Sequence, residues 1–262
     1  MAFIYNPRAA DFQFGILIQD AQILLAKSGR LLTGAELGDI TGRYNSNHIC
    51  CRYGETAYRT CTAVLTKQAT EPQDLSKYSI RELFASAPEE TAQLVARALH
   101  ISEWLMRTRF CITCGHQLHF SSTESALECP QCCAVIFPVI APCIIVLVSK
   151  GEQILLARHA QRNTDLYTCL AGFIEAGETA EQAVIREVKE ETGLNVKNIR
   201  YCGSQSWPYP NQLMLAFKAD YESGTITVQK EEIAEAYWFS KNALPAIPRA
   251  GSAAHRLICG EW

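Results

Sequence analysis

The sequence predicts a protein with mixed α and β structure, built from three successive parts. The C-terminal half alternates short apolar strands with a polar helix, which is typical of a mixed sheet with helices on its faces. Two C-x2-C pairs ahead of it indicate a four-cysteine ribbon. Short β-like runs separated by glycine-containing turns predict a small α+β or mostly β unit at the N-terminus.

The composition indicates a soluble globular protein without a global preference for nucleic acid. With 262 residues, the chain can bury a substantial core without disulfides. The 24 Lys and Arg residues face 27 Asp and Glu residues, which gives a net charge of -3. The first residues lack a signal-peptide pattern, and no apolar run reaches the roughly 18 residues that span a bilayer. We therefore expect a cytoplasmic protein that does not enter a membrane.

The N-terminal part carries no recognisable catalytic motif. Its apolar runs predict strands at residues 14–18, 23–25 and 57–65. The glycines between these runs predict turns: Gly29, Gly34, Gly38 and Gly42. His48 beside Cys50 and Cys51 raises the alternative of a metal site, which we set aside because no second pair lies at ligand spacing. From Pro88 a helix is expected, with Ser86 as its cap and Trp104 on its packed apolar stripe.

The predicted ribbon contains four cysteines as two pairs: Cys111, Cys114, Cys129 and Cys132. Each pair can direct two sulfurs at one ion, so the two pairs supply the four thiolates of a tetrahedral Zn²⁺ site. In so short a segment the zinc replaces a core, so its expected role is structural. Cys133 follows the second pair directly and stays open as a substitute for Cys132.

A four-cysteine ribbon makes a nucleic-acid-binding regulator the rival function. Residues 115–128 contain no Lys or Arg, so the basic stripe expected of such a module is missing there. The C-terminal half predicts further elements instead. The expected helix covers residues 180–192, and the expected strands cover residues 143–148, 154–157, 199–202, 213–219, 226–228 and 236–239.

The 180–192 helix carries an unusual concentration of carboxylates. Thr179 with Gln182 predicts a capping box, and Gly193 suits the position just past the helix end. The helical spacing places three glutamates near one face: Glu187, Glu190 and Glu191. Bare like charges repel by roughly a few tenths of a kcal/mol per pair. A solvated acidic face is the plain alternative, but a bound cation fits better because Arg186 is the one well-placed positive partner on this helix.

Hard divalent cations prefer carboxylate oxygens and keep waters that phosphates can replace. Mg²⁺ or Mn²⁺ on this helix is therefore expected to bridge a pyrophosphate and to activate water for in-line attack. The predicted reaction is the hydrolysis of a phosphoanhydride.

Residues 172–194, GFIEAGETAEQAVIREVKEETGL, resemble the signature box of the Nudix hydrolases. The resemblance implies an α/β/α sandwich with a mixed sheet for this part of the chain. It implies that Glu187 and Glu191 are metal ligands and that Glu190 is a further ligand or a base. By the same resemblance, Arg186 orients a glutamate and the carbonyl of Ala171 is another metal ligand.

Residues 204–212, SQSWPYPNQ, form a second informative block. Its aromatic residues alternate with prolines, which predicts a stiff extended loop able to present ring faces to a base or ribose. The block resembles SQPWPFPxS, the marker of the NADH pyrophosphatases of the Nudix superfamily, which also have a four-cysteine ribbon before the Nudix domain. The resemblance implies a substrate site at Gln205, Ser206, Trp207, Pro208, Tyr209, Pro210, Asn211 and Gln212. This chain departs from the marker at Ser206, Tyr209 and Gln212.

The resemblance assigns further positions outside the two blocks. Glu232 is implied as a metal ligand, with the adjacent Glu231 open as its substitute. Four residues match substrate positions: Phe173, Phe137, Glu124 and Ala254. Implied domains are an N-terminal α+β domain at 1–105, a zinc ribbon at 106–138 and a Nudix domain at 139–262. The family hydrolyses NAD(H) to NMN(H) and AMP, and some members remove NAD caps from RNA 5′ ends. Its members are homodimers. A Nudix hydrolase of another nucleotide, such as ADP-ribose or a dinucleoside polyphosphate, is the closest alternative.

Overall fold

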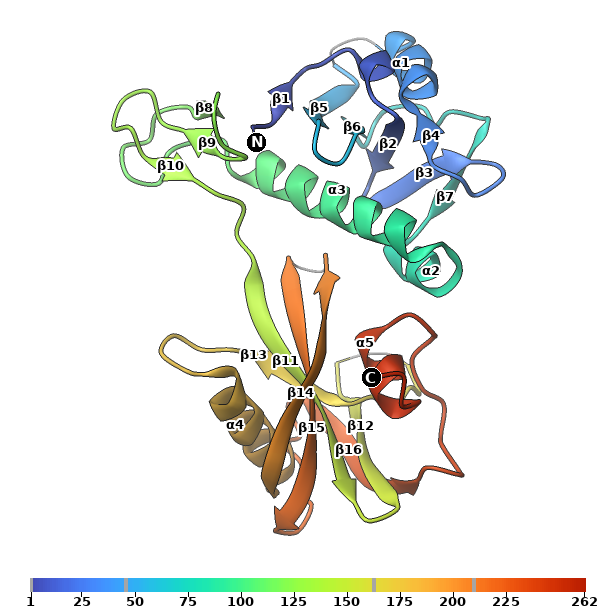
Figure 1. Cartoon of the computed structure of the whole chain (residues 1–262), viewed down its shortest axis with the longest axis vertical. Coiled ribbons are helices and arrows are strands. Elements are labelled where there is room, and N and C mark those ends of the chain that lie inside the picture. The colour runs from blue at the N-terminus through green and yellow to red at the C-terminus, as the bar shows by residue number, and fades with distance from the viewer. Residues whose placement is uncertain (1, 45–46, 162–163, 209–210) are drawn as a thin grey trace. The chain divides into compact units, whose positions relative to one another are not determined.

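The chain forms two compact units, Met1–Val139 and Ile140–Trp262 (Figure 1). The computed structural model describes residues 2–44, 47–161, 164–208 and 211–262. Each unit has its own buried apolar clusters, so each is described by itself. In these described ranges, none of the helices is both long and apolar enough to cross a bilayer.

A sheet and three helices make up most of the N-terminal unit, which confirms its α+β character. The sheet order is β1-β5-β6-β2-β3-β7, with β4 beside β2. These strands are β1 (Ile4–Tyr5), β2 (Phe14–Gln19), β3 (Gln22–Ala26), β4 (Leu32–Thr33), β5 (Ile49–Glu55), β6 (Thr60–Leu65) and β7 (Leu75–Tyr78). The helices are α1 (Gly34–Gly42), α2 (Ile80–Ser86) and α3 (Glu89–Arg107), with a short 3-10 turn at Ala9–Asp11.

The α1 helix corrects the expectation of turns at Gly34, Gly38 and Gly42. Thr33 and Glu36 form a capping box that starts the helix, and Leu37 is fully buried on its inner face. A Cβ at Gly34 would overlap the carbonyl oxygens of the Ala9–Asp11 segment and its neighbour. Glycine is therefore used here for close packing of a helix, and tertiary contacts outweigh its poor helix propensity.

The α3 helix begins at Glu89, so Ser86 is not its N-cap as expected. Its N-cap is Pro88 without a side-chain hydrogen bond, while Ser86 ends α2. Trp104 is buried, as expected, and the hydroxyl of Tyr53 donates to the Ala98 carbonyl at 2.9 Å. This helix therefore packs on the sheet through both an apolar stripe and a buried hydrogen bond.

The ribbon is a small sheet of the order β10-β9-β8. Its strands are β8 (His119–Phe120), β9 (Leu127–Glu128) and β10 (Val135–Ile136). Leu118 and Leu127 share a buried cluster with Phe3 and with Trp104 of α3. The ribbon thus completes a core that it does not build alone.

The C-terminal unit contains the predicted mixed sheet. The order is β14-β15-β11-β12-β16, with β13 paired to β11; β11 and β15 are parallel, and the other pairs are antiparallel. The strands are β11 (Ala141–Lys150), β12 (Gln153–His159), β13 (Leu170–Phe173), β14 (Asn195–Trp207), β15 (Gln212–Ser223) and β16 (Ile233–Ser240). The helices are α4 (Ala180–Thr192) and α5 (Ala253–Ile258).

Residues of β11 alternate between two cores on opposite faces of this sheet. Ile144 and Val146 belong to the cluster that includes Val184 of α4. Ile145 belongs to the cluster that includes Leu257 of α5. Figure 1 shows α4 and α5 on opposite sides of the strands. The expected α/β/α sandwich is confirmed.

Two local expectations were wrong. The 226–228 run forms no strand, because its backbone bonds to the end of α4 instead: the Thr227 amide donates to the Thr192 carbonyl at 2.9 Å. Residues 204–207 belong to β14 rather than to a loop, and Trp207 pairs with Gln212 across the hairpin. The extended loop is thereby reduced to the tip of that hairpin.

Adjacent positions on α4 allow a matched test of the α4 core. Val184 is fully buried, whereas Ile185 is 49% exposed. We expect Val184→Ala to lower the free energy of unfolding by about 2 kcal/mol, from lost apolar burial and the cavity left behind. Ile185→Ala should change it by less than about 0.5 kcal/mol. Urea unfolding of both variants measures the difference, and equal losses would contradict the assigned faces.

Candidate functional site

The α4 helix begins and ends where the sequence predicts. The Thr179 side chain accepts from the Gln182 amide, and the Gln182 side chain accepts from the Thr179 amide, which completes the capping box. Gly193 takes a left-handed φ of 73° and its amide donates to the Lys189 carbonyl. Both ends are therefore fixed by local hydrogen bonds.

The guanidinium of Arg186, in the middle of α4, forms hydrogen bonds with several residues of the helix and of the loop before it. Arg186 donates to Glu178 from Nε at 2.6 Å and from Nη2 at 2.9 Å. It also donates from Nη1 to Glu187 at 2.8 Å and to Glu190 at 3.0 Å, and from Nη2 to the Phe173 carbonyl at 2.9 Å. The 173–178 loop and the helix are thus joined by charge-assisted bonds.

Glu178 lies within the box, but the sequence predicts no role for it. Its contact with Arg186 lowers the pKa of Glu178 to about 2, and the Glu175 amide adds a second hydrogen bond. The signal was present in the box itself, which specifies a glutamate six residues after Gly172. Spacing alone did not reveal that this glutamate would face an arginine eight residues further along.

A glycine lets the helix approach strand β13 closely. A Cβ on Gly172 would overlap the carboxylate of Glu187. Gly172 pairs with Ile144 in β11, so the strand cannot shift without breaking the ladder. The absence of a side chain at this position therefore sets where the Glu187 carboxylate lies.

Glu191 is the most deeply buried carboxylate of the group, with 2% of its surface exposed. Burial, and then the negative charges of Glu187, Glu232 and Glu190, raise its pKa to about 8. Its Oε2 atom is buried without a hydrogen-bond partner. Burial also raises the pKa of Glu187. No positive charge lowers the pKa of Glu191, in contrast to Glu187, whose carboxylate accepts a hydrogen bond from Arg186.

Glu232 reaches the same cluster from the segment before β16. The Gln229 amide donates to the Glu191 carbonyl at 3.1 Å, and the Glu232 amide donates to the Gln229 carbonyl at 3.0 Å. Ala171, whose carbonyl the sequence also nominated, lies in β13 next to Gly172. The nominated metal ligands thus come from one helix, one strand and one turn of the same unit.

These residues fit a hard divalent cation in their chemistry. Such a cation prefers oxygen ligands, and the buried Oε2 atom of Glu191 has no hydrogen-bond partner among the described residues. A cation would also offset the repulsion between the negative charges of the glutamates. Ligands of one Mg²⁺ or Mn²⁺ ion lie at most about 4.2 Å apart, yet among the described residues no three of these carboxylates lie within 4.8 Å of one another. Sharing one ion therefore requires side-chain rotation, for example of Glu190 away from Arg186.

The four ribbon cysteines do lie around a single point. Their sulfurs are all within 4.8 Å of one another, and the Sγ atoms are 3.4 Å apart for Cys114 and Cys129, 3.5 Å for Cys114 and Cys132, and 3.6 Å for Cys111 and Cys132. Thiolates at about 2.3 Å from a tetrahedral ion would be about 3.8 Å apart. Cys133 stands outside the cluster with a left-handed φ of 59°. The set consequently fits a structural metal, with Cys132 as the fourth ligand.

The nominated residues of the SQSWPYPNQ block are distributed between β14, the hairpin tip and β15. Gln205 is buried; its Nε2 donates to the Gly251 carbonyl at 2.7 Å, and its Oε1 accepts from the Ala253 amide at 2.8 Å. It therefore fastens β14 to the start of α5, where Ala254 is buried in the core. Ser206 is exposed, and Asn211 takes a left-handed φ of 51°. Tyr209 and Pro210 lie outside the described residues.

The remaining nominated residues belong to different units. Phe173 is 48% exposed in β13, beside the Arg186 network. Phe137, which is 54% exposed, and Glu124 lie in the N-terminal unit. Pro208 is buried at the hairpin tip. Within the C-terminal unit, the Phe173 carbonyl accepts a hydrogen bond from Arg186 of the carboxylate cluster, whereas Ala254 is buried in the core beneath α5.

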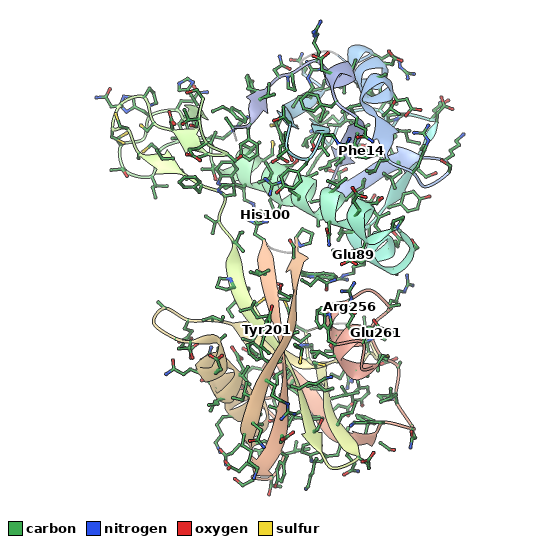
Figure 2. All side chains as sticks on the ribbon, viewed as in Figure 1. Phe14, Glu89, His100, Tyr201, Arg256 and Glu261 are labelled. Atoms are coloured by element: carbon green, nitrogen blue, oxygen red, sulfur yellow. The ribbon has the colours of Figure 1, made fainter. Side chains whose placement is uncertain are left out.

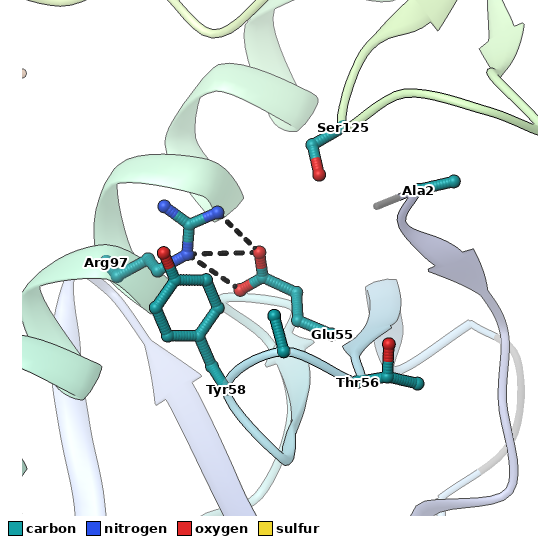
Figure 3. A pocket seen from close by; sticks show the side chains of 7 residues that line it. Ala2, Glu55, Thr56, Tyr58, Arg97 and Ser125 are labelled. Carbon is teal, nitrogen blue, oxygen red and sulfur yellow. Dashed lines mark hydrogen bonds and ion pairs between the residues drawn. The ribbon is translucent and has the colours of Figure 1, made fainter.

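A separate cavity of about 210 Å³ lies in the N-terminal unit (Figure 3). Arg97 forms an ion pair with the buried Glu55 at 2.6 Å, and its guanidinium lies 4.2 Å from the centre of the Tyr58 ring. The arginine thus neutralises a buried carboxylate, which is a structural use. His48, Cys50 and Cys51 form no metal-capable group among the residues that the structure describes.

Comparisons with known proteins show which family the chain is similar to. Residues 138–258 match the NUDIX domain family. The chain is 43% identical over 196 residues to a protein of Erwinia tasmaniensis named NAD-capped RNA hydrolase NudC, covering 75% of this chain and 74% of that protein. Proteins of the same name match from Vibrio vulnificus, at 38% over 239 residues with 91% and 86% covered, and from Haemophilus influenzae, at 46% over 194 residues with 72% and 74% covered.

The raised pKa of Glu191 predicts a specific pH dependence of stability in the presence of a chelator. The folded protein keeps a proton that the unfolded chain releases above about pH 4.5, so this carboxylate lowers stability as pH rises from about 4.5 to about 8. Glu191→Gln removes that loss. We expect the variant to unfold at a higher temperature than the wild type at pH 8.5, by about 4 °C for each kcal/mol recovered, and to converge with it near pH 4.5.

Thermal unfolding followed by circular dichroism at several pH values measures this effect. Glu222→Gln, at an exposed position of β15, removes a charge without touching the cluster. A difference between Glu191→Gln and wild type that stays constant from pH 5 to pH 8.5 would contradict the assignment.

Proposed function

The chain belongs to the Nudix hydrolases, in the NADH pyrophosphatase family that carries a four-cysteine ribbon, and from this premise we propose that it hydrolyses the pyrophosphate of NAD(H) to NMN(H) and AMP. The carboxylate cluster around Arg186, with its buried and unpartnered Glu191 oxygen, is the observation that carries the proposal. The names of the relatives extend it to the removal of NAD caps from RNA 5′ ends. Both substrates present the same bond to the same site.

We assign the metal-binding role to Glu187, Glu190, Glu191, Glu232 and the Ala171 carbonyl. A bound Mg²⁺ or Mn²⁺ neutralises pyrophosphate charge and makes water a better nucleophile. Arg186 holds Glu187 and Glu190 in place through Nη1. Glu190, whose side chain is 52% exposed, is open to solvent and suits proton acceptance from the attacking water. Glu178 acts through Arg186 and touches no substrate.

The substrate contacts remain assigned by resemblance. By that resemblance the 205–212 block, Phe173, Phe137 and Glu124 are proposed as substrate positions; Ala254, which is buried in the α5 core, is proposed on the resemblance alone. Phe173 offers an exposed ring one residue after Gly172, which suits stacking on a base. Gln205 has its amide oxygen and one N–H committed to α5, so its proposed role is to position the hairpin.

We further propose Zn²⁺ as the ribbon metal, a homodimer as the active assembly, a cytoplasmic location, and functional domains at 1–105, 106–138 and 139–262. The sulfur spacing supports zinc. Ser206 and Gln212 depart from the dinucleotide marker, which keeps ADP-ribose or a dinucleoside polyphosphate as the second candidate substrate.

A comparison of substrates tests the function. Purified protein with Mn²⁺ or with Mg²⁺ is incubated with NADH, ADP-ribose and NAD-capped RNA, and the products are resolved by chromatography. We expect AMP and NMNH from NADH, and a 5′-monophosphate RNA from the capped transcript. Glu191→Gln should lose about a hundredfold or more in turnover, whereas Glu181→Gln, exposed in the first turn of α4, should retain it.

If ADP-ribose is hydrolysed and neither NAD substrate is cleaved, the second candidate substrate class would replace NAD(H) in the proposal. No cleavage of any nucleotide, together with RNA binding, would favour a regulator built on the ribbon. Full turnover by Glu191→Gln would show that α4 is not the metal site.

Metal removal tests the ribbon independently of turnover. Chelation is expected to free one metal ion and to expose the amides of β9 and β10 to hydrogen exchange, because this small sheet has few contacts without its metal. The exchange of β11 and β15 should stay unchanged. Protection of β9 and β10 that survives complete metal removal would refute a structural metal, and metal analysis would identify the ion.

A further inference from the structure

Three titratable side chains that have no role assigned above meet at the C-terminal end of α5. The Sγ atom of Cys259 lies 3.5 Å from Nε2 of His255. The other ring nitrogen, Nδ1, lies 3.2 Å from Oε1 of Glu261. Cys259 is exposed, whereas the His255 side chain is 20% exposed. A thiol, an imidazole and a carboxylate thus form a compact cluster, with ligand atoms within 4.8 Å of one another.

Backbone geometry builds this arrangement. Four residues separate His255 from Cys259, so one helical turn places the thiol over the ring, and the Cys259 amide donates to the His255 carbonyl at 2.9 Å. Gly260 then takes a left-handed φ of 74°. The Gly260 amide donates to the Leu257 carbonyl and the Glu261 amide donates to the Arg256 carbonyl, which is a Schellman motif. This reversal returns Glu261 to the imidazole.

The helix that carries the cluster is held firmly. Ser252 caps its start by accepting from the His255 amide, and Leu257 is buried under the sheet. After the reversal, Trp262 lies against Gly203 of β14, and its main-chain oxygen accepts from Lys218 of β15. Figure 2 labels Arg256 and Glu261 on this part of the chain, and Arg256 lies 5.4 Å from the Trp262 ring. The three side chains therefore occupy a fixed surface feature.

We propose that Cys259 is a nucleophilic thiol, activated by His255 and Glu261, that reacts with small hydroperoxides. Nε2 of His255 accepts the thiol proton, and the Glu261 carboxylate beside Nδ1 favours the tautomer in which Nε2 is free and stabilises the imidazolium. The Nδ1–H is poorly directed at Glu261 in this structure, so the contact acts through charge rather than through an aligned hydrogen bond. The nearby cation, Arg256, lies over Trp262.

The chemistry balances without a further reactant. The Cys259 thiolate attacks the distal oxygen of a hydroperoxide, an S–O bond forms, and the O–O bond breaks. Sulfur is oxidised by two electrons to the sulfenic acid, while the leaving oxygen is reduced and takes the proton from His255 as an alcohol or water. The exposed position of the sulfur gives the oxidant access.

A metal site is the competing use of these side chains, because their ligand atoms lie within 4.8 Å of one another. The separations favour the thiol. Glu261 faces Nδ1 and Cys259 faces Nε2, so the carboxylate and the sulfur approach opposite nitrogens of one ring. A metal on Nε2 would have Cys259 as its nearer partner, whereas Glu261 is nearer to the other nitrogen.

The test compares two exposed cysteines within the full-length, metal-loaded protein. Iodoacetamide is added between pH 6 and pH 9, and peptide mass spectrometry follows the alkylation of Cys259 and of Cys133, an exposed thiol outside the metal cluster. We expect Cys259 to react about tenfold faster than Cys133 near pH 7, because the imidazole beside its sulfur can accept the thiol proton. Hydrogen peroxide followed by dimedone should label Cys259 first.

Two variants separate activation from simple exposure. His255→Asn should bring the rate at Cys259 down to that of Cys133, and Glu261→Gln should reduce it partly, with circular dichroism confirming that α5 and the sheet remain folded. Equal rates at Cys259 and Cys133, or an unchanged rate in His255→Asn, would overturn the proposal. Protection of Cys259 by one equivalent of added Zn²⁺ would also overturn it, in favour of a metal site.

Discussion

The hydrogen bonds of one guanidinium fix the geometry of the carboxylate site. An arginine side chain has five N–H hydrogens, and Arg186 donates to Glu178 twice and once each to Glu187, Glu190 and the Phe173 carbonyl. Its donors are therefore fully used within the protein, and it acts by holding other groups. Lysine cannot replace it, because an ammonium has three donors and no planar fork. The capped helix and the strand at Gly172 both serve this contact by keeping the helix and loop in register.

Arg186 places a positive charge beside Glu187 and Glu190, but Glu191 has no such partner. Glu191 is buried with Glu187 and Glu232 as its electrostatic neighbours, and no hydrogen bond reaches its Oε2 atom. Holding a carboxylate in this way costs stability, which a bound cation offsets by mass action. The hairpin of β14 and β15 contains the opposite case, a buried polar side chain with hydrogen-bond partners. There Gln205 is satisfied within the protein and joins the hairpin to α5, so a residue in the substrate block also supports the fold.

Local signals allowed the sequence to predict the helix of the box, its two caps, five of the strands of this unit and the four cysteines, because each depends on residues close together in the chain, whereas the short β13 strand was not predicted. The errors have non-local causes. The α1 helix was missed because the packing of Gly34 against the 9–12 segment outweighs its poor propensity. The 226–228 run was taken for a strand because apolar alternation does not reveal that its amides bond to the end of α4. Glu178 was not recognised as an anchor since its partner lies eight residues away on another element.

Strand β11 lies in the middle of the sheet, with β15 along one edge and β13 followed by β12 along the other. Its alternate residues feed the α4 core and the α5 core. Deleting one residue between 144 and 148 would therefore exchange the two faces for the rest of the strand and offer each core the side chains shaped for the other. Within β11 a change in chain length is therefore incompatible with this fold, because it would move the side chains of each face toward the wrong core.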